Sequence, residues 1–424
     1  MSDLTDTKPK RRVYTGWRIV GANSVVWSLQ SMIWVQGYGN MAVELRDQFG
    51  WSKSFLSFVY AGTRAETAIF GPIQGRAIGT QGIKKVMRMG AVMGMIGFLA
   101  IAWADTQAEF VVAMLILALA MSLIGFLTIT SATVRWFERR RARAMSILTM
   151  GFAFGGFCAP ILVLGFDRIG WRPTIIIAGS LLSCSAWWAA AIANRTPADY
   201  GEPMDGLQAA EAVVAPKAEG VTDRHYTASE AMRTRGFWMI SLGHGAALLV
   251  VSSSMAHLAL YLTEDRGYSA GRAALVAGIV PLFQIVGTGL GGILGDRMNK
   301  RLIAGVAMLM HGAALIILVW VDHVAAVGAF VVLHGIAWGV RGPQMQAIRA
   351  DYFGSTAFAS IMGWSQIIVT MGSIAGPVLA GVLADSTGDY QLGFTILGIA
   401  AAFGVVFWIL AAPPAPDDDL ATIA

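Results

Sequence analysis

The chain alternates long apolar runs with short polar segments. Each run holds roughly 20–25 residues, the length at which a helix crosses a hydrocarbon core of about 30 Å. The pattern predicts twelve membrane-spanning helices, which fall into two groups of six on either side of a polar segment at 194–235. We therefore predict an all-α membrane protein with one six-helix half at 1–193 and a second at 236–424. The predicted spans are 17–43, 53–78, 85–104, 108–133, 143–165, 171–193, 236–262, 270–295, 301–321, 325–349, 356–383 and 390–411.

The polar segment 194–235 reads as a linker between the halves. Most of it consists of Pro, Asp, Glu and Ala without periodicity, which is typical of a flexible chain. Its end differs, because Thr227 and Glu230 have the spacing of a capping box. The sequence therefore predicts a short interfacial helix that leads into the seventh span.

Composition and charge agree with this topology. The chain is 56% hydrophobic and 13% charged, whereas soluble domains are about 25% charged. Most of the 31 Lys and Arg lie in the N-terminal tail and in alternate loops, as the positive-inside rule describes. Both termini are thus predicted in the cytoplasm, and the short loops favour an inner or plasma membrane. Since membrane topology explains the net charge of +5, we expect no nucleic-acid partner.

The two halves also repeat in sequence. Gly50-Trp51-Ser52 aligns with Gly267-Tyr268-Ser269 at an offset of 217 residues, and the same offset places Gly75 on Gly292. A parallel duplication of six helices is the architecture of transporters whose halves rock about a site near the membrane midplane.

Motifs along most of the chain resemble the major facilitator superfamily. Gly71-Pro72-x-x-Gly75-Arg76 with Gly82-x-Lys84-Lys85 resembles the signature after its second span, and Gly295-Asp296-Arg297 resembles the second copy. The resemblance implies alternating access, with Gly71, Gly75, Arg76, Asp296 and Arg297 as the conformational motif. Further motifs are similar to the branch of monocarboxylate transporters and oxalate–formate exchangers: Leu45-Arg46-x-x-Phe49-Gly50-Trp51-Ser52, Trp136-Phe137-x-Arg139-Arg140-Arg141, Asp167-Arg168-x-Gly170-Trp171-Arg172 and Tyr352-Phe353-Gly354.

The sequence also departs from that family. Gly79 stands where the first signature usually has an acid. The branch commonly has a substrate-binding basic residue in span eight, but here the one charge of that span before Asp296 is Arg272 in its first turn, and span eleven has no lysine. The substrate residues of the branch therefore cannot be transferred to this chain.

Span one carries a polar and aromatic stripe. At about 100° per residue, one face holds Asn23, Trp27, Gln30, Trp34 and Tyr38. Such a face lines either a watery cavity or a contact between helices. We predict the cavity, with Gln30, Trp34 and Tyr38 as substrate-binding residues.

Span two carries two charges near its middle. Charged residues within a bilayer are expensive and usually functional. Arg64 and Glu66 lie about 200° apart on the helix, so they cannot face one point. We predict Arg64 at the cavity or between the halves, as a substrate-binding residue. Glu66 is then either a buried counter-charge or a proton carrier.

Span ten supplies the third charge within a span. His334, Trp338 and Arg341 share one face. We predict that Arg341 and Trp338 bind substrate. Alternatively, Arg341 snorkels to the interface or tethers a loop through Asp351. His334 is either a packing residue or a proton relay.

Two arginines, one in each half, suit a carboxylate because a guanidinium is a planar fork that stays charged. We therefore predict a secondary transporter of a small carboxylate-bearing organic anion, with protons as the candidate coupling ion. The alternatives are an exporter of lipophilic drugs and a membrane sensor with the same fold. We expect a monomer without catalytic residues, metal or cofactor. Cys158 and Cys184 lie in apolar spans, where they are packing residues. Gly287-x-Gly289-x-x-Gly292 matches a dinucleotide-binding fingerprint, but it lies inside a predicted membrane helix and therefore indicates close helix packing.

Overall fold

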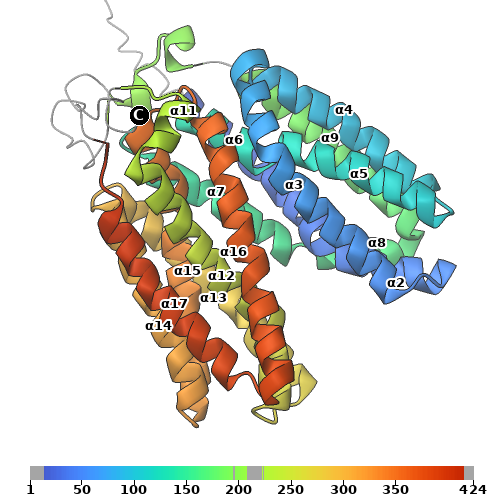
Figure 1. Cartoon of the computed structure of the whole chain (residues 1–424). Coiled ribbons are helices and arrows are strands. Elements are labelled where there is room, and N and C mark those ends of the chain that lie inside the picture. The colour runs from blue at the N-terminus through green and yellow to red at the C-terminus, as the bar shows by residue number, and fades with distance from the viewer. Residues whose placement is uncertain (1–13, 194–195, 208–221, 223, 415–424) are drawn as a thin grey trace, which may run out of the picture.

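The computed structural model describes residues 14–193, 196–207, 222 and 224–414, and it consists of two helical bundles (Figure 1). The first bundle is the N half and the second the C half. The N half comprises α1 Thr15–Gln30, the π-helical turn η1 Ser31–Gln36, α2 Gly37–Phe49, α3 Lys53–Gln81, α4 Ile83–Trp103, α5 Gln107–Ile124, α6 Phe126–Val134, α7 Arg141–Phe157, α8 Pro160–Ile169 and α9 Trp171–Ala193. The C half comprises α12 Arg235–Glu264, α13 Ala270–Gly295, α14 Lys300–Trp320, α15 Val324–Phe353, α16 Phe358–Thr387 and α17 Gln391–Leu410.

These helices match the predicted spans one for one, and the all-α fold is confirmed. Ten helical segments of the described chain are long and apolar enough to cross a membrane, with α5–α6 and α7–α8 counted as one segment each. The continuous α1–η1–α2 segment and α3 complete the twelve. Pro160 begins α8 after a break in the fifth span, since a proline inside a helix removes one backbone hydrogen bond.

The repeated Gly-Trp/Tyr-Ser sequence forms the same turn in both halves. Gly50 and Gly267 have φ of 67° and 65°, a conformation that glycine adopts readily. Ser52 and Ser269 then cap the next helix by accepting a hydrogen bond from the backbone N–H of the third residue beyond. The repeat is therefore a turn followed by an N-cap.

Each half has its own hydrophobic core, and the halves meet near one end of the molecule. We call this the linker end, because α1 begins there and the linker packs there. The contacts between halves pair α3 with α16 and α7 with α13. In addition, α7 touches α15, and α6 touches α15 and α16. The bundles converge at this end and diverge toward the opposite one, the upper and lower ends in Figure 1.

Part of the predicted flexible linker is packed against the N half. Residues 197–207 contain the short helices η2 Pro197–Tyr200 and η3 Met204–Gly206. The Asp205 carboxylate accepts hydrogen bonds at 3.0–3.3 Å from the backbone N–H groups of Glu138, Arg139 and Arg140. Asp205 is buried. The Glu202 carboxylate accepts further hydrogen bonds from the Thr15 N–H and hydroxyl at 3.0 and 2.7 Å. The absence of periodicity did not indicate this docking, because single side chains and not a repeating apolar face supply the attachment.

The second part of the linker is packed against the C half. The backbone N–H groups of Thr222 and Tyr226 donate to the carbonyls of Asp351 and Phe353. The capping box of Thr227 and Glu230 is formed, and it begins the short helix α11 Ala228–Arg233. Residues 208–221 and 223 of the linker lie outside the described chain.

Candidate functional site

A buried ion-pair network joins the halves at the linker end. Arg141 Nη1 at the start of α7 lies 2.6 Å from Asp351 Oδ1 on α15, and Lys300 Nζ lies 2.8 Å from Asp351 Oδ2. All three side chains are at most 7% exposed. Asp351 therefore bridges the two halves. The suggested tether between Asp351 and Arg341 was wrong, because both Asp351 oxygens pair with other cations.

Asp296 makes a second contact between the halves. Its Oδ1 accepts a hydrogen bond from the Arg143 backbone N–H at 3.3 Å, and its Oδ2 lies 3.5 Å from Arg143 Nε. Burial raises the pKa of the Asp296 carboxyl to about 6, although Arg143 and Lys300 oppose this shift. The position equivalent to Asp296 in the first half is Gly79, which has open space around it. The junction is therefore asymmetric.

Close helix packing supports the same junction. A Cβ at Gly75 would lie 2.5 Å from the Ala359 carbonyl oxygen, and one at Gly71 would lie 3.0 Å from the Gly363 carbonyl oxygen. Small residues allow α3 and α16 to approach this closely. Arg76 and Arg297, the other two residues of the predicted conformational motif, are exposed.

The predicted stripe of span one faces the interior of the N half in this conformation. The Gln30 amide donates to the Met121 carbonyl at 2.8 Å, and the Tyr38 hydroxyl donates to the Leu56 carbonyl at 2.7 Å. Trp34 is 8% exposed and, with Tyr38, lines a small pocket inside the N half that also touches Phe98. That Gln30, Trp34 and Tyr38 bind substrate stays a prediction.

A π-helical turn interrupts the regular spacing of this stripe. Residues Ser31–Gln36 form a π-helix in the middle of the first span. A π-helix has more residues per turn than an α-helix, so an angle of 100° per residue does not hold across it. Gln30 before the turn and Tyr38 after it are nevertheless both buried in the N half.

The two charges of α3 occupy different sides of that helix. Glu66 shares a stripe with Ile69 and Ile73, which are 70% and 55% exposed. Glu66 Oε2 is buried, without a hydrogen-bond partner among the described residues. Arg64 lies on α3, but its side chain lies outside the described part of the chain.

The C half contains a buried group of cationic and imidazole side chains. His311 Nδ1 on α14 lies 3.1 Å from His334 Nδ1 on α15, and both residues are at most 1% exposed. Arg341 is 1% exposed and lies within electrostatic range of this pair. His244 on α12 lies within the same range of Arg341 and Arg349.

Arg341 differs from the other buried cations of the described chain, because Arg141 and Lys300 pair with Asp351, and Arg349 donates hydrogen bonds to the Met345 carbonyl and Ser365 Oγ. It forms no ion pair there, and its Nε and Nη1 have no hydrogen-bond partner. A buried charge is normally paired, because burial without a partner is costly. Its guanidinium is therefore available to an anion. Trp338, on the same face of α15, is partly buried.

Sequence reasoning missed two residues near this site. Arg349 was assigned to the end of a span, yet α15 continues to Phe353, and Arg349 is buried with hydrogen bonds to the Met345 carbonyl and Ser365 Oγ. Gly354, which ends the helix with φ of 77°, could have indicated this later helix end, because glycine is common just after the last residue of a helix. His311 carried no such signal, because only the packing of α14 on α15 brings it to His334.

The structure thus divides the predicted substrate-binding residues between two interiors. Gln30, Trp34 and Tyr38 lie within the N half, whereas Arg341 lies within the C half. It brings His334 and Arg341 into one cluster, as their shared helix face predicted. The described part of the chain contains no group of His, Cys, Asp and Glu that could hold a metal ion.

A family model agrees with the two-bundle architecture. The model described as Major Facilitator Superfamily matches residues 22–258 and 240–423. The chain belongs to this superfamily. Because its relatives are multi-pass membrane transporters, this member of the Major Facilitator Superfamily is a membrane transporter.

The resemblance to monocarboxylate transporters is also confirmed. This superfamily member is 23% identical to "Monocarboxylate transporter 13" of Bos taurus, over 84% of its own length and 82% of the relative. It is 24% identical to "Monocarboxylate transporter 11" of Homo sapiens, over 93% of its own length and 82% of the relative.

Solved structures share the fold of this superfamily member. The human organic anion transporter MFSD10 (TETRAN) matches with a TM-score of 0.69 at 14% identity, over 93% of this chain and all of that one. The transporter FucP in the outward conformation matches with a TM-score of 0.71 at 13% identity, over 95% of this chain and all of that one.

Proposed function

We propose that the chain is a secondary active transporter that moves a small carboxylate-bearing organic anion by alternating access. The observation that carries this proposal is the buried, unpaired guanidinium of Arg341. The side chains of two acids in the described C half, Asp351 and Asp296, are buried, and both are already paired, with Arg141 and Lys300 and with Arg143 respectively. An anionic passenger would supply the charge that Arg341 lacks. The names of the monocarboxylate relatives support the same substrate class.

The position of Arg341 suits such a site. It lies ten residues before Asp351 on α15, so it is roughly 15 Å farther into the membrane than the ion-pair network. That distance puts it near the middle of the 30-residue helix α15. Substrate sites of transporters built from repeats lie near the midplane. A carboxylate can accept two parallel hydrogen bonds from one guanidinium.

The histidine pair offers a route to proton coupling. With Nδ1 facing Nδ1 at 3.1 Å, one imidazole must donate and the other accept. A further proton on the pair would add positive charge beside Arg341. A bound carboxylate offsets that charge, so the anion and the proton favour each other's binding. We propose that His334, together with His311, couples protons to anion transport, while Glu66 is the second candidate proton carrier.

The conformation itself supports a direction of opening. We propose that the linker end is cytoplasmic, as the basic loops suggest, and that the membrane is the inner or plasma membrane. The structure, closed at the linker end by Asp296 and Asp351, then represents an outward-facing state. Its likeness to FucP in the outward conformation supports this proposal. Inward opening requires the contacts of Gly71, Gly75 and Asp296 with the opposite half to separate.

Uptake into sealed proteoliposomes tests the proposed function. We expect the purified protein to accumulate a small monocarboxylate, and an inward proton gradient to increase this accumulation. Arg341→Gln should reduce the apparent affinity for the anion by about 10- to 150-fold, the effect of one charge-assisted hydrogen bond. Arg341→Lys should reduce the affinity by a smaller factor, because lysine keeps the positive charge but lacks the planar guanidinium that binds both carboxylate oxygens.

Arg235→Gln is the control, since this exposed arginine at the start of α12 should not affect uptake. Unchanged affinity in folded Arg341→Gln would refute the role of Arg341. Transport of lipophilic cations instead of carboxylates would favour the drug-exporter alternative. A folded protein that transports neither class would favour a sensor.

A further inference from the structure

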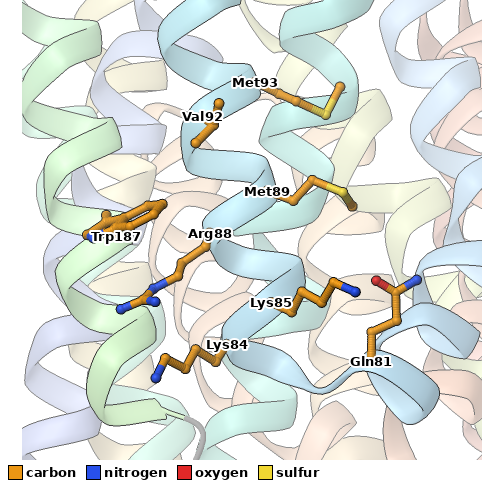
Figure 2. Close-up of a pocket in the computed structure, with 8 residues that line it drawn as sticks. All are labelled: Gln81, Lys84, Lys85, Arg88, Met89, Val92, Met93 and Trp187. Atoms are coloured by element: carbon orange, nitrogen blue, oxygen red, sulfur yellow. The ribbon is translucent and has the colours of Figure 1, made fainter.

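A groove lies on the outer surface of the N half, away from the junction between the halves. Its volume is about 600 Å³, and it runs along α4 and α9 from the linker end (Figure 2). Lys84, Lys85 and Arg88 line its linker end. Beyond them the lining is apolar, including Met89, Val92 and Trp187. The groove is thus basic at the membrane interface and apolar deeper in the membrane.

The apolar part of the groove faces the lipid. Met89, Val92 and Trp187 are 41%, 49% and 45% exposed, and exposed apolar side chains of a membrane-spanning helix contact acyl chains. Along α4, nine residues separate Lys84 from Met93, or roughly 13.5 Å. Half of the hydrocarbon core is about 15 Å. The groove therefore extends over the depth of one leaflet.

Arg88 is built into the groove rather than projecting freely into water. Its guanidinium carbon lies 4.5 Å from the ring centre of Trp187, and Figure 2 shows the side chain directed toward that ring. This contact holds the cation at the border between the polar and apolar parts. Its Nε is buried and has no hydrogen-bond partner. A guanidinium held at this depth suits a phosphate group.

We propose that this groove binds an anionic phospholipid. Lys85 and Arg88 contact the phosphate and headgroup, with Lys84 adding positive charge, and an acyl chain lies along Met89, Val92 and Trp187. Charge complementarity specifies the headgroup: three of the eight lining residues are cationic and none is acidic. Basic pockets between membrane helices bind anionic headgroups for this reason. A zwitterionic lipid would bring its own cation toward the same three residues.

Lipid-dependent thermal stability of the full chain in detergent tests this site. Dioleoyl phosphatidylglycerol should raise the melting temperature of the wild-type protein by several degrees more than dioleoyl phosphatidylcholine does. The double variant Lys85→Gln/Arg88→Gln should lose that difference. Arg235→Gln, which removes an exposed cation at the same end of the molecule, should retain it. Because each protein is compared with itself in the two lipids, a changed baseline stability does not affect the result.

Native mass spectrometry separates the possible sources of the anion. We expect phosphatidylglycerol to stay bound to the wild-type protein and to Arg235→Gln, and to dissociate from the double variant. Equal stabilisation by inorganic phosphate would overturn the proposal in favour of a free-anion site. Equal retention of phosphatidylcholine, or full retention by the double variant, would also overturn it. The outcome is independent of carboxylate uptake, so it stands or falls separately from the proposed function.

Discussion

At the scale of single residues, the two halves have buried polar interiors of different chemistry. The N half holds neutral amides, of which Gln30 and Gln74 donate to backbone carbonyls, and Asn23 is fully buried. The C half holds Arg341 and the histidine pair. The sequence repeats the helices of the two halves but not these side chains. Near Arg341 the offset between the halves is 216, which places Trp136-Phe137 on Tyr352-Phe353 and Gly125 on Arg341. The chemical asymmetry is thus an addition to the duplicated fold.

The histidine pair gives a prediction at this scale. His311→Gln and His334→Gln should each abolish the stimulation of anion uptake by an inward proton gradient, because glutamine cannot take up the proton. Exchange of anion for anion at equal pH should persist, since Arg341 is intact. Both rates can be measured in proteoliposomes. His225→Gln, in the exposed linker, serves as the control. Proton-stimulated uptake that survives both substitutions would move the proton role to Glu66.

At the scale of the elements, close approaches of helix backbones define where the halves touch. Gly75 packs against Ala359 and Ser360 of α16, whereas Gly79, one turn later on α3, meets nothing within 4 Å. The same residue type on one helix therefore has two roles. Hydropathy alone could not distinguish them, because it predicts the helix but not its neighbour.

This difference predicts opposite effects of one substitution. Gly79→Ala should raise the stability by up to about 1 kcal/mol through helix propensity. Gly75→Ala should keep α3 and α16 apart, since its Cβ would lie 2.5 Å from the Ala359 oxygen and 2.7 Å from Ser360 Cα. We expect reduced uptake and no gain in melting temperature for Gly75→Ala. Melting temperatures and uptake rates of the two variants test this difference. Equal melting temperatures and equal uptake in both would contradict the close packing at Gly75.

The linker is the second element whose packing gives a prediction. Asp205 has φ of 60° and accepts three backbone N–H groups of the loop before α7. Asp205→Ala leaves these donors without that acceptor, so we expect a loss of about 1–3 kcal/mol in stability. Asp385→Ala, at an exposed position of α16, should change it by less than about 0.5 kcal/mol. Thermal unfolding compares the two, and equal melting temperatures would show that the Asp205 carboxylate contributes no stability.

At the scale of the whole molecule, the junction at the linker end makes the conformation sensitive to pH. Burial raises the pKa of Asp296 from its ordinary 3.8 to about 6 in the closed junction. When the halves separate and water reaches the carboxyl, its pKa returns toward the ordinary value. The closed form therefore binds a proton more tightly than the open form. Its advantage is fully present near pH 4 and is lost as pH rises through about 6.

We accordingly predict that raising the pH from 4 to 7 shifts the population toward the form open at the linker end, by roughly ten- to hundredfold. Spin labels at Thr80 and Thr356, introduced with Cys158→Ser and Cys184→Ser, can report the distance between halves. Asp296→Asn should remove the pH dependence across this window, because an amide does not titrate. A pH dependence that persists in Asp296→Asn would assign it to another group.

The sequence by itself determined the helices, their number and their duplication. Apolar runs long enough to cross a bilayer have one stable backbone conformation there, since unpaired backbone groups are costly in lipid. The turn of Gly50 and the cap of Ser52 are equally local, so their repeat at Gly267 and Ser269 is recognisable from the order of residues alone.

Only the tertiary structure decided which polar side chains meet. Arg141 and Asp351 are 210 residues apart in sequence, and the partner of His334 lies on a neighbouring helix. Periodicity assigns a side chain to a face but does not say which helix covers that face, and it did not predict the π-helical turn at Ser31–Gln36. Contacts between helices depend on packing that no single helix specifies, which is why Arg341 could be predicted as functional while its surroundings could not.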